Sequence, residues 1–226
     1  MTCLGTQSVT IALFLGASWR VAASPEPLLP TKIGEAAATL AAAFHDDPLS
    51  RFLLPREESR RRWLHLTMNA DLRQVLPEGH VYTVGGEDVE GVVGWLPPGR
   101  YPLPTLRSLR FLAGIIVRVP TGGISVRSVA RAVQITRLWE RLHLRERHWY
   151  LYVLGAHPSQ QGKGLGRALL DPILARADSE RLPAYTETSN PRNLTFYGHF
   201  GFDVVQEVQA PGGGPPMWTL LRPPVG

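Results

Sequence analysis

The residue types and their spacing point most clearly to a chemical role in one segment, residues 153–170, VLGAHPSQQGKGLGRALL. A strand-like apolar run leads through a loop with Gly162, Gly164 and Gly166 into a helix-like run. Glycines let backbone N–H groups approach a ligand closely, and the free N–H groups of a helix N-terminus favour phosphate. Lys163 adds a positive charge. The segment predicts a phosphate-binding turn; a tight turn without a ligand is the structural alternative.

The glycine spacing differs from that of two other phosphate loops. The dinucleotide pattern GxGxxG requires glycine where Arg167 stands, and the Walker pattern requires glycine at position 157 and serine or threonine at 164. Neither a nicotinamide dinucleotide nor a nucleoside triphosphate is therefore indicated. The sequence instead contains Gln161-x-x-Gly164-x-Gly166 between a predicted strand and a predicted helix.

This pattern and a second group of residues resemble the signatures of the GNAT (GCN5-related) N-acetyltransferase superfamily. In the second group, Asn190 is followed seven residues later by Tyr197 and then by Gly201 and Phe202. Within the superfamily, four segments are similar to puromycin N-acetyltransferase and its actinobacterial relatives: EPLLPTKIGEAAATLAAAFHDDP, HPSQQGKGLG, ETSNPRNLTFYGHFGF and PGGGPPMW. The resemblance spans roughly residues 30–222.

The resemblance implies an α/β fold, the GNAT acyl-CoA N-acyltransferase fold, whose mixed sheet splays between its fourth and fifth strands to admit acetyl-CoA. The glycine turn would hold the pyrophosphate, and the strand before it would pair with the pantetheine arm, although a core strand would look the same. The implied cofactor-binding residues are Leu154, Gly155, Ala156, Gln161, Gly162, Lys163, Gly164, Leu165, Gly166, Asn190 and Asn193. For the two asparagines, capping of a short helix is the alternative.

Tyr197 is the predicted proton donor to the departing CoA thiolate. A phenol with a pKa of about 10 can protonate a thiolate whose conjugate acid has a pKa of about 8.5 to 9. The alternative is an ordinary core aromatic packed beneath Phe196 and Phe200.

An acceptor amine arrives as ammonium and must lose a proton before it attacks, so a base or a water relay is needed. Glu187, on the strand that leads to the Asn190 motif, is the predicted catalytic base. Asp46, Asp47 and His80 are further candidates. Each of these residue types more often has a solvated or capping role.

Composition limits the class of protein. A chain of 226 residues with 44% hydrophobic and 19% charged residues fits one ordinary globular unit. Cys3 is the only cysteine and no HExxH pattern occurs, so neither a disulfide nor a metal site is predicted. The formal charge is +5, but the basic cluster at 60–62 is read as a solvated helix face, so no nucleic-acid partner is predicted.

Periodicity predicts one domain at 31–222 with helices and strands in alternation. Residues 1–30 are read as a first strand, an extension or a weak signal-like segment. A helical hairpin at 103–147 either covers the acceptor side of the cofactor cleft or serves as extra packing or a dimer face. The predicted helices are 33–44, 57–74, 106–117, 126–143, 164–179 and 193–199, and the predicted strands are 80–84, 90–96, 149–156, 184–188, 202–208 and 217–222.

The sequence therefore predicts an N-acetyltransferase that moves an acetyl group from acetyl-CoA to a primary amine of a small molecule by direct attack in a ternary complex. The acceptor is expected to be an antibiotic or metabolite, with a puromycin-like amine as one candidate. We expect a cytoplasmic monomer or homodimer without a membrane partner. A noncatalytic acyl-CoA-binding regulatory module and a protein N-acetyltransferase are the alternatives.

Overall fold

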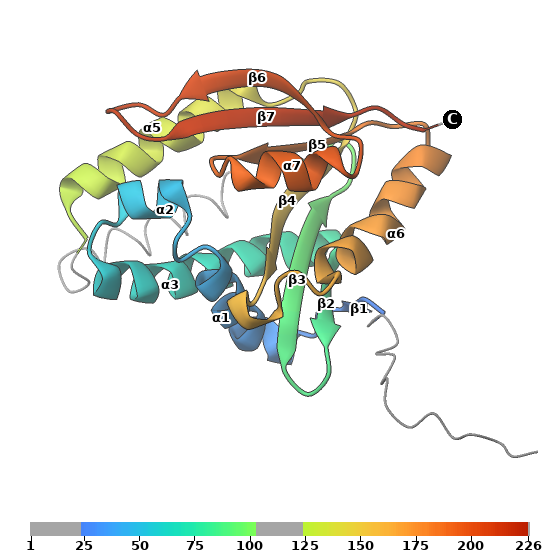
Figure 1. Cartoon of the computed structure of the whole chain (residues 1–226), viewed down its shortest axis with the longest axis horizontal. Helices are drawn as coiled ribbons and strands as arrows, with labels where there is room; N and C mark the ends of the chain where they lie inside the picture. The colour runs from blue at the N-terminus through green and yellow to red at the C-terminus, as the bar shows by residue number, and fades with distance from the viewer. Residues whose placement is uncertain (1–23, 103–123, 226) are drawn as a thin grey trace, which may run out of the picture.

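The computed structural model describes residues 24–102 and 124–225, and its frame is a seven-stranded sheet in the order β1-β2-β3-β4-β5-β7-β6 (Figure 1). β4 and β5 are parallel, and every other neighbouring pair is antiparallel. The strands are β1 (Glu26–Pro27), β2 (Val81–Gly85), β3 (Val89–Leu96), β4 (Trp149–Ala156), β5 (Ala184–Thr188), β6 (Asp203–Gln209) and β7 (Pro216–Arg222). The sheet confirms the predicted mixed α/β class.

Helices cover both faces of the sheet. On one face are α1 (Ile33–Ala43), α2 (Pro48–Leu53), α3 (Glu57–Val75) and α5 (Val126–Leu142), and on the other are α6 (Leu165–Ser179) and α7 (Arg192–Gly198). Short 3-10 turns lie at 30–32, 76–78 and 158–160. Each face buries its own apolar core, because successive strand side chains point to opposite sides. In the described part of the chain, no helix is both long and apolar enough to span a bilayer.

Most predicted elements of the described ranges are confirmed, with ends that agree within one residue. The predicted helix at 106–117 lies outside the described residues, and so does most of 1–30, of which the structure describes the two-residue edge strand β1 and its surroundings. The sequence reading missed α2. Pro48 is disfavoured inside a helix but is the first residue of α2, where a missing N–H costs nothing, and Asp47 caps this helix by accepting from the Leu49 amide at 2.9 Å.

The central strands diverge where the resemblance predicted. β4 pairs with β3 from Tyr150 to Ala156, interrupted by one bulge, but with β5 at two positions only, Trp149 to Ala184 and Tyr150 to Tyr185. Beyond them β4 and β5 separate, as Figure 1 shows. Within residues 24–102 and 124–225, no strand pairs with the β5-facing edge of residues 151–156. Thr186 donates its hydroxyl to the first carbonyl of this edge, the Leu151 oxygen, at 3.0 Å.

A close approach of α6 and α7 explains one of the motif glycines. A Cβ on Gly166 would lie 2.8 Å from Cζ of Phe196 and 3.0 Å from its Cε2. Both distances are shorter than van der Waals contact, so the first turn of α6 can rest on the Phe196 ring only because residue 166 has no side chain. This glycine is thus required for packing, whatever its amide binds.

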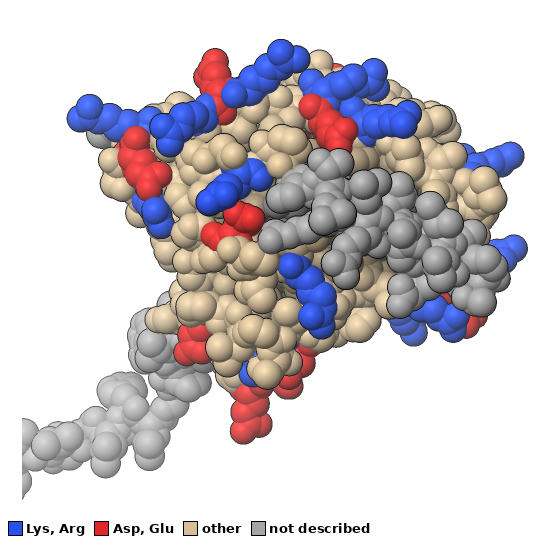
Figure 2. Space-filling model, turned by 180° about the vertical axis from the view of Figure 1, so that it is seen from behind, with Lys and Arg blue, Asp and Glu red and all other residues tan. Residues whose placement is uncertain are grey.

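The basic cluster at 60–62 is only partly the solvated face that the sequence predicted. Arg61 and Arg62 are exposed and pair with Glu57 and Glu58. Arg60 is 5% exposed and donates to the Leu54 and Pro55 carbonyls, so for this residue the prediction was wrong. On the face seen in Figure 2, basic side chains lie in separate groups with acidic ones among them.

A polar contact joins α3 to the sheet. The Tyr152 hydroxyl donates to Oδ1 of Asp71 at 3.1 Å. Tyr152 is the extra residue of a β-bulge, because Trp95 pairs with Leu151 and Gly94 with Val153. Burial raises the pKa of Asp71 from 3.8 to about 6, and the hydrogen bond from Tyr152 offsets part of that rise.

We predict that Asp71→Asn removes a pH dependence of stability. Because the folded pKa of Asp71 lies above its unfolded value, its stabilising contribution is complete below about pH 4 and is lost as pH rises through about 6. Asparagine carries no charge, so the free energy of unfolding of the variant should exceed that of wild type by up to about 3 kcal/mol at pH 7 and by least near pH 4. Urea unfolding across this range measures the difference. Asp171→Asn, at an exposed site on α6, is the control and should follow wild type; identical pH curves for all three proteins would contradict the prediction.

Candidate active site

The glycine turn before α6 presents free backbone donors. Gly162 and Gly164 have left-handed φ angles of +78° and +83°, and a Cβ on either would meet nothing within 4 Å. Gly164 is the N-cap of α6, and no side chain caps the helix. The amides of the first turn therefore have no intrahelical acceptor and lie at the positive end of the helix dipole. Such a turn suits a phosphate group.

Two polar side chains of the turn are held within it. Nε2 of Gln161 donates to the Ala156 carbonyl at 3.2 Å, which links the turn to the end of β4. Nζ of Lys163 donates to Oε1 of Gln160 at 2.7 Å. Both bonds are exposed, so an anion can attract the Lys163 ammonium at little cost. The turn and residues 154–156 thus form one continuous edge.

The two motif asparagines shape the connection from β5 to α7. Oδ1 of Asn190 accepts from the Arg192 amide at 3.1 Å, and Nδ2 of Asn193 donates to Oγ1 of Thr188 at 3.0 Å. The Asn190 bond fits the helix-capping alternative, whereas Asn193 lies inside α7 and donates to a side chain, so its bond caps no helix N–H. Contact of either residue with a cofactor remains a prediction.

Tyr197 lies in the core beneath the α6 and α7 face of the sheet and is 6% exposed. Its ring centroid is 5.2 Å from that of Phe196 and 5.6 Å from that of Phe202. Burial raises its pKa; a hydrogen bond with Thr186 opposes the rise and the Glu187 charge adds to it. The phenol therefore keeps its proton at neutral pH and can donate a hydrogen bond.

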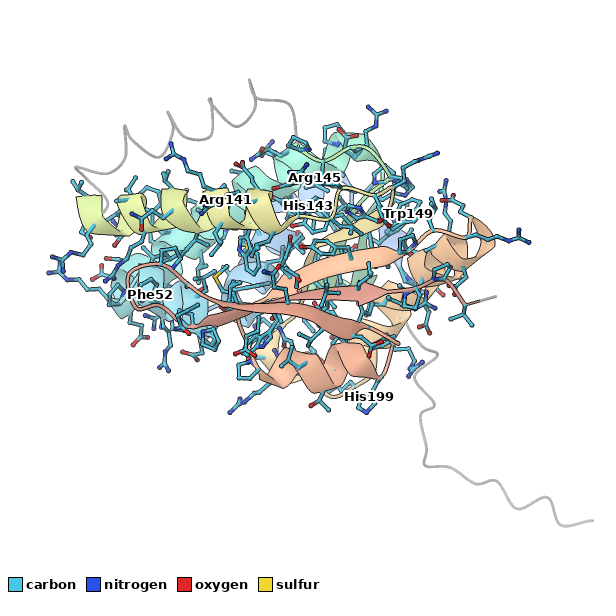
Figure 3. The ribbon with its side chains drawn as sticks, turned by 90° about the horizontal axis from the view of Figure 1, so that it is seen from above. Phe52, Arg141, His143, Arg145, Trp149 and His199 are labelled. Atoms are coloured by element: carbon cyan, nitrogen blue, oxygen red, sulfur yellow. The ribbon has the colours of Figure 1, made fainter. Side chains whose placement is uncertain are left out.

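Glu187 follows Thr186 in β5 and so faces the opposite side of the sheet. Its Oε2 accepts from the Tyr150 hydroxyl at 2.6 Å, and its Oε1 lies 3.3 Å from Nδ1 of His143. In Figure 3, His143 lies at the end of α5, across the sheet from α7. The predicted acid and base thus lie on opposite faces, both beside the point where β4 and β5 diverge.

The other three candidate bases have different surroundings. Asp47 caps α2 and also accepts from the Ser189 hydroxyl at 3.0 Å, and burial raises its pKa. Asp46 is exposed and lies 3.4 Å from His45. His80 packs its ring edge-on against Trp149, and burial lowers its pKa. The structure does not bring these residues together with Glu187 and Tyr197.

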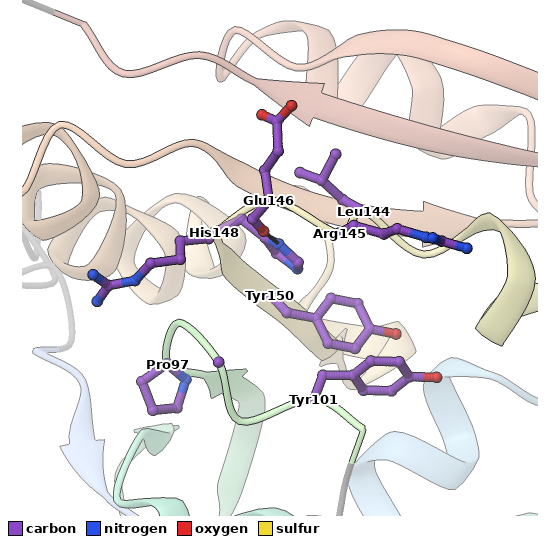
Figure 4. A pocket seen from close by; sticks show the side chains of 9 residues that line it. Pro97, Tyr101, Leu144, Arg145, Glu146, His148 and Tyr150 are labelled. Carbon is purple, nitrogen blue, oxygen red and sulfur yellow. Dashed lines mark hydrogen bonds between the residues drawn. The ribbon is translucent and has the colours of Figure 1, made fainter.

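A group of aromatic and histidine side chains beside Glu187 was missed by sequence reasoning. His148 Nε2 lies 3.2 Å from His143 Nε2, and the Tyr101 and His143 rings stack with centroids 3.8 Å apart. Tyr101, Tyr150 and His148 line a cavity of about 80 Å³ (Figure 4). The run HLRERHWYLY contains these histidines, but nothing in its spacing shows that α5 ends there and turns its imidazoles towards β5.

Comparisons with known proteins agree with this geometry. Residues 54–202 match the acetyltransferase (GNAT) family. An uncharacterised N-acetyltransferase of Schizosaccharomyces pombe is 31% identical over 179 residues, which cover 77% of this chain and 72% of that one.

Two solved structures share the fold. A Corynebacterium glutamicum protein described as histone acetyltransferase HPA2 and related acetyltransferase has a TM-score of 0.65 and 21% identity, over 90% of this chain and 97% of that one. Arylalkylamine N-acetyltransferase 2 of Aedes aegypti has a TM-score of 0.58 and 13% identity, over 88% and 97%. With the family match over more than half of its length, this chain belongs to the GNAT family and is an acetyl-CoA-dependent acetyltransferase.

Proposed function

We propose that this enzyme transfers the acetyl group of acetyl-CoA to a primary amine of a small molecule, by direct attack in a ternary complex. The observation that carries the proposal is the free edge of β4, which leads into the uncapped N-terminus of α6. The donors of that turn suit the pyrophosphate, and the edge at 154–156 suits the amides of the pantetheine arm, as it would an added strand.

Side chains on the two faces of the sheet have different roles in the proposed reaction. Acetyl-CoA supplies the acetyl group as a thioester whose sulfur leaves with a negative charge. Tyr197 donates a hydrogen bond towards that sulfur from one face, and Glu187 takes the ammonium proton on the other. Burial raises the pKa of Tyr197, so the phenol stabilises the departing thiolate mainly by donating a hydrogen bond and less by transferring its proton completely. The amides at 154–156 polarise the thioester oxygen.

The surroundings of Glu187 indicate the class of acceptor. Two carboxylates, Glu187 and Asp71, lie on this face among four tyrosines: Tyr101, Tyr150, Tyr152 and Tyr185. Negative charge and aromatic rings together favour a cationic amine on an apolar body. The Aedes aegypti protein, which shares the fold, is named for an arylalkylamine acceptor. An antibiotic acceptor such as puromycin, a role in antibiotic resistance and a cytoplasmic location extend the proposal on the sequence resemblance alone.

The decisive experiment measures free-thiol release from acetyl-CoA with a panel of acceptors. The panel contains puromycin, an arylalkylamine, an aliphatic diamine and a peptide with a free N-terminus. We expect release with a small amine and little with the peptide. Acetyl-CoA binding without release for any amine would favour the noncatalytic module, and release with the peptide alone would favour a protein N-acetyltransferase.

We predict that Gly164→Ala weakens CoA binding about tenfold or more. An L-residue at a φ of +83° is strained by roughly 1–2 kcal/mol, and relief of that strain turns the first amides of α6 away from the phosphates. Gly79→Ala is a matched control, because Gly79 has a φ of +84°, equally open space and a position away from the turn. Calorimetry should give wild-type affinity for the control, and equal affinities of the two variants would refute the assignment.

We predict that Tyr197→Phe lowers kcat about 10- to 100-fold while the dissociation constant of acetyl-CoA changes less than twofold. Only a hydroxyl is removed, so the packing against Phe196 and Phe202 remains. Tyr82→Phe, at a partly buried tyrosine of β2, is the control. If Tyr197→Phe turns over as fast as the control across neutral pH, Tyr197 has no role in the mechanism.

A further inference from the structure

A short turn between α1 and α2 contacts both β4 and the end of β5. Phe44, the C-cap residue of α1, begins this turn, and Asp47, the N-cap residue of α2, ends it. Its backbone is closed, because the Asp47 amide donates to the Phe44 carbonyl at 3.2 Å and the His45 amide donates to the Ala42 carbonyl at 3.4 Å. We call residues 44–47 the bridging turn.

On the β4 side, the bridging turn rests on backbone that carries no side chain. A Cβ on Gly155 would lie 2.9 Å from Cδ2 of Leu40, 3.0 Å from Cβ of Ala43 and 3.5 Å from Cε2 of Phe44. The first two distances are shorter than ordinary van der Waals contact, so the end of α1 reaches β4 only because residue 155 is glycine. The start of the bridging turn is thus held against the segment 154–156.

On the β5 side, the bridging turn is hydrogen-bonded to the residue that follows the strand. Oδ1 of Asp47, the oxygen that caps α2, also accepts from the Ser189 hydroxyl at 3.0 Å. Ser189 is 6% exposed, so water competes little for this hydroxyl. The end of the bridging turn is therefore fixed to the end of β5.

The two points of contact lie at about the same height along the sheet. The last paired positions of β4 and β5 are Tyr150 and Tyr185. Four residues further along each strand are Leu154 and Ser189, so Gly155 and Ser189 lie on either side of the separation. The bridging turn therefore crosses from β4 to β5 where their ladder no longer joins them.

His45 lies in the bridging turn between these two contacts and has a buried nitrogen without a partner. Nε2 of His45 is buried and, within the part of the chain that the structure describes, has no hydrogen-bond partner. Nδ1 lies 3.4 Å from Oδ1 of Asp46, and this carboxylate favours a hydrogen on Nδ1. Nε2 of the neutral ring then carries a lone pair and accepts. A buried acceptor that lacks a donor is costly, so a ligand with a donor fits this position.

Three other described side chains have a buried nitrogen without a partner, and they lie elsewhere. Arg60 is on α3, where its guanidinium bonds to carbonyls of the preceding loop. His80 packs edge-on against Trp149, and Trp95 is in the same core on the α6 side of the sheet. His45 differs from all three because its turn spans two strands at the point where they have separated.

We propose that Nε2 of His45 accepts a hydrogen bond from the pantetheine arm of acetyl-CoA. This inference rests on the proposed function, which places that arm along the β5-facing edge of residues 151–156 and so beside the bridging turn. The arm carries amide N–H groups and a hydroxyl, and both are donors. The β4 backbone pairs with the arm within the plane of the sheet, and His45 holds it from the α1 face. His45 orients the cosubstrate and takes no part in proton transfer.

The bridging turn holds the imidazole in place before a ligand binds. Its ends are fixed at Gly155 and Ser189, and the Asp46 carboxylate lies beside Nδ1. Binding therefore orders little that is not already ordered. Preorganised contacts of this kind add affinity at a low entropic cost, so the loss of Nε2 should be measurable.

Calorimetry with CoA tests the contact without any turnover. His45→Ala should bind CoA about tenfold more weakly than wild type, because one buried hydrogen bond is lost. His45→Gln should recover most of that loss, since the amide of glutamine reaches about as far as Nε2. His45→Asn, whose amide reaches only as far as Nδ1, should bind as weakly as His45→Ala. His65→Ala, at an exposed position on α3, is the matched control and should bind like wild type.

Shortened acetyl donors identify the part of the arm that donates. S-acetyl-pantetheine keeps the amides and the hydroxyl, whereas S-acetyl-N-acetylcysteamine keeps only the amide next to the sulfur. If the hydroxyl or the outer amide donates, His45→Ala should raise the KM of S-acetyl-pantetheine alone, and if the inner amide donates, it should raise both. A rise in the KM of the acceptor amine with unchanged CoA affinity would assign His45 to the acceptor and overturn the proposal.

The outcomes keep the two proposals apart. If all three His45 variants bind CoA like His65→Ala, the contact is overturned and the proposed function stands. Equal losses in the three variants would mean that the ring only fills space, and recovery by His45→Asn in place of His45→Gln would trace the effect to Asp46; either result also overturns the contact. Wild type that binds CoA but releases no thiol with any amine overturns the proposed function, and the calorimetry still decides the contact.

Discussion

The proposed site depends on an edge of β4 that, among the described residues, pairs with no other strand beyond Tyr150. Buried N–H and C=O groups must be hydrogen-bonded, and β4 satisfies most of one edge by pairing with β3. Its other edge pairs with β5 at two positions before the strands separate. In the proposed complex, a cosubstrate with amides of its own completes this edge.

Successive side chains of β5 point to opposite faces of the sheet, which separates the groups around the two predicted catalytic residues. Thr186 and Glu187 are neighbours in β5, so one faces Tyr197 and the other faces Tyr150 and His143. Under the proposed function, a reacting centre beside β5 would have the Tyr197 phenol on one side and the Glu187 carboxylate on the other. The sheet would thus keep the proposed proton donor apart from the proposed base.

Local patterns predicted most of the fold and part of the site. The turn at Gly164 and the helix that carries Tyr197 are encoded by neighbouring residues, so spacing was enough to find them. α2 was missed because a proline, which is disfavoured inside helices, is here the first residue of one, and Arg60 was misplaced because its partners are carbonyls of a preceding loop. His143 meets Glu187 only through tertiary packing across 44 residues of chain, and His148 contacts His143; no rule of local sequence spacing predicts the first contact.

The close packing of Gly166 on Phe196 has a mechanical consequence. Phe196 precedes Tyr197 in the same two-turn helix, and its ring fills the space that a side chain at residue 166 would need. The first turn of α6 and the helix that carries Tyr197 therefore pack directly against each other. Under the proposed function, one close contact sets the distance between the turn that would hold the diphosphate and the phenol that would face the sulfur.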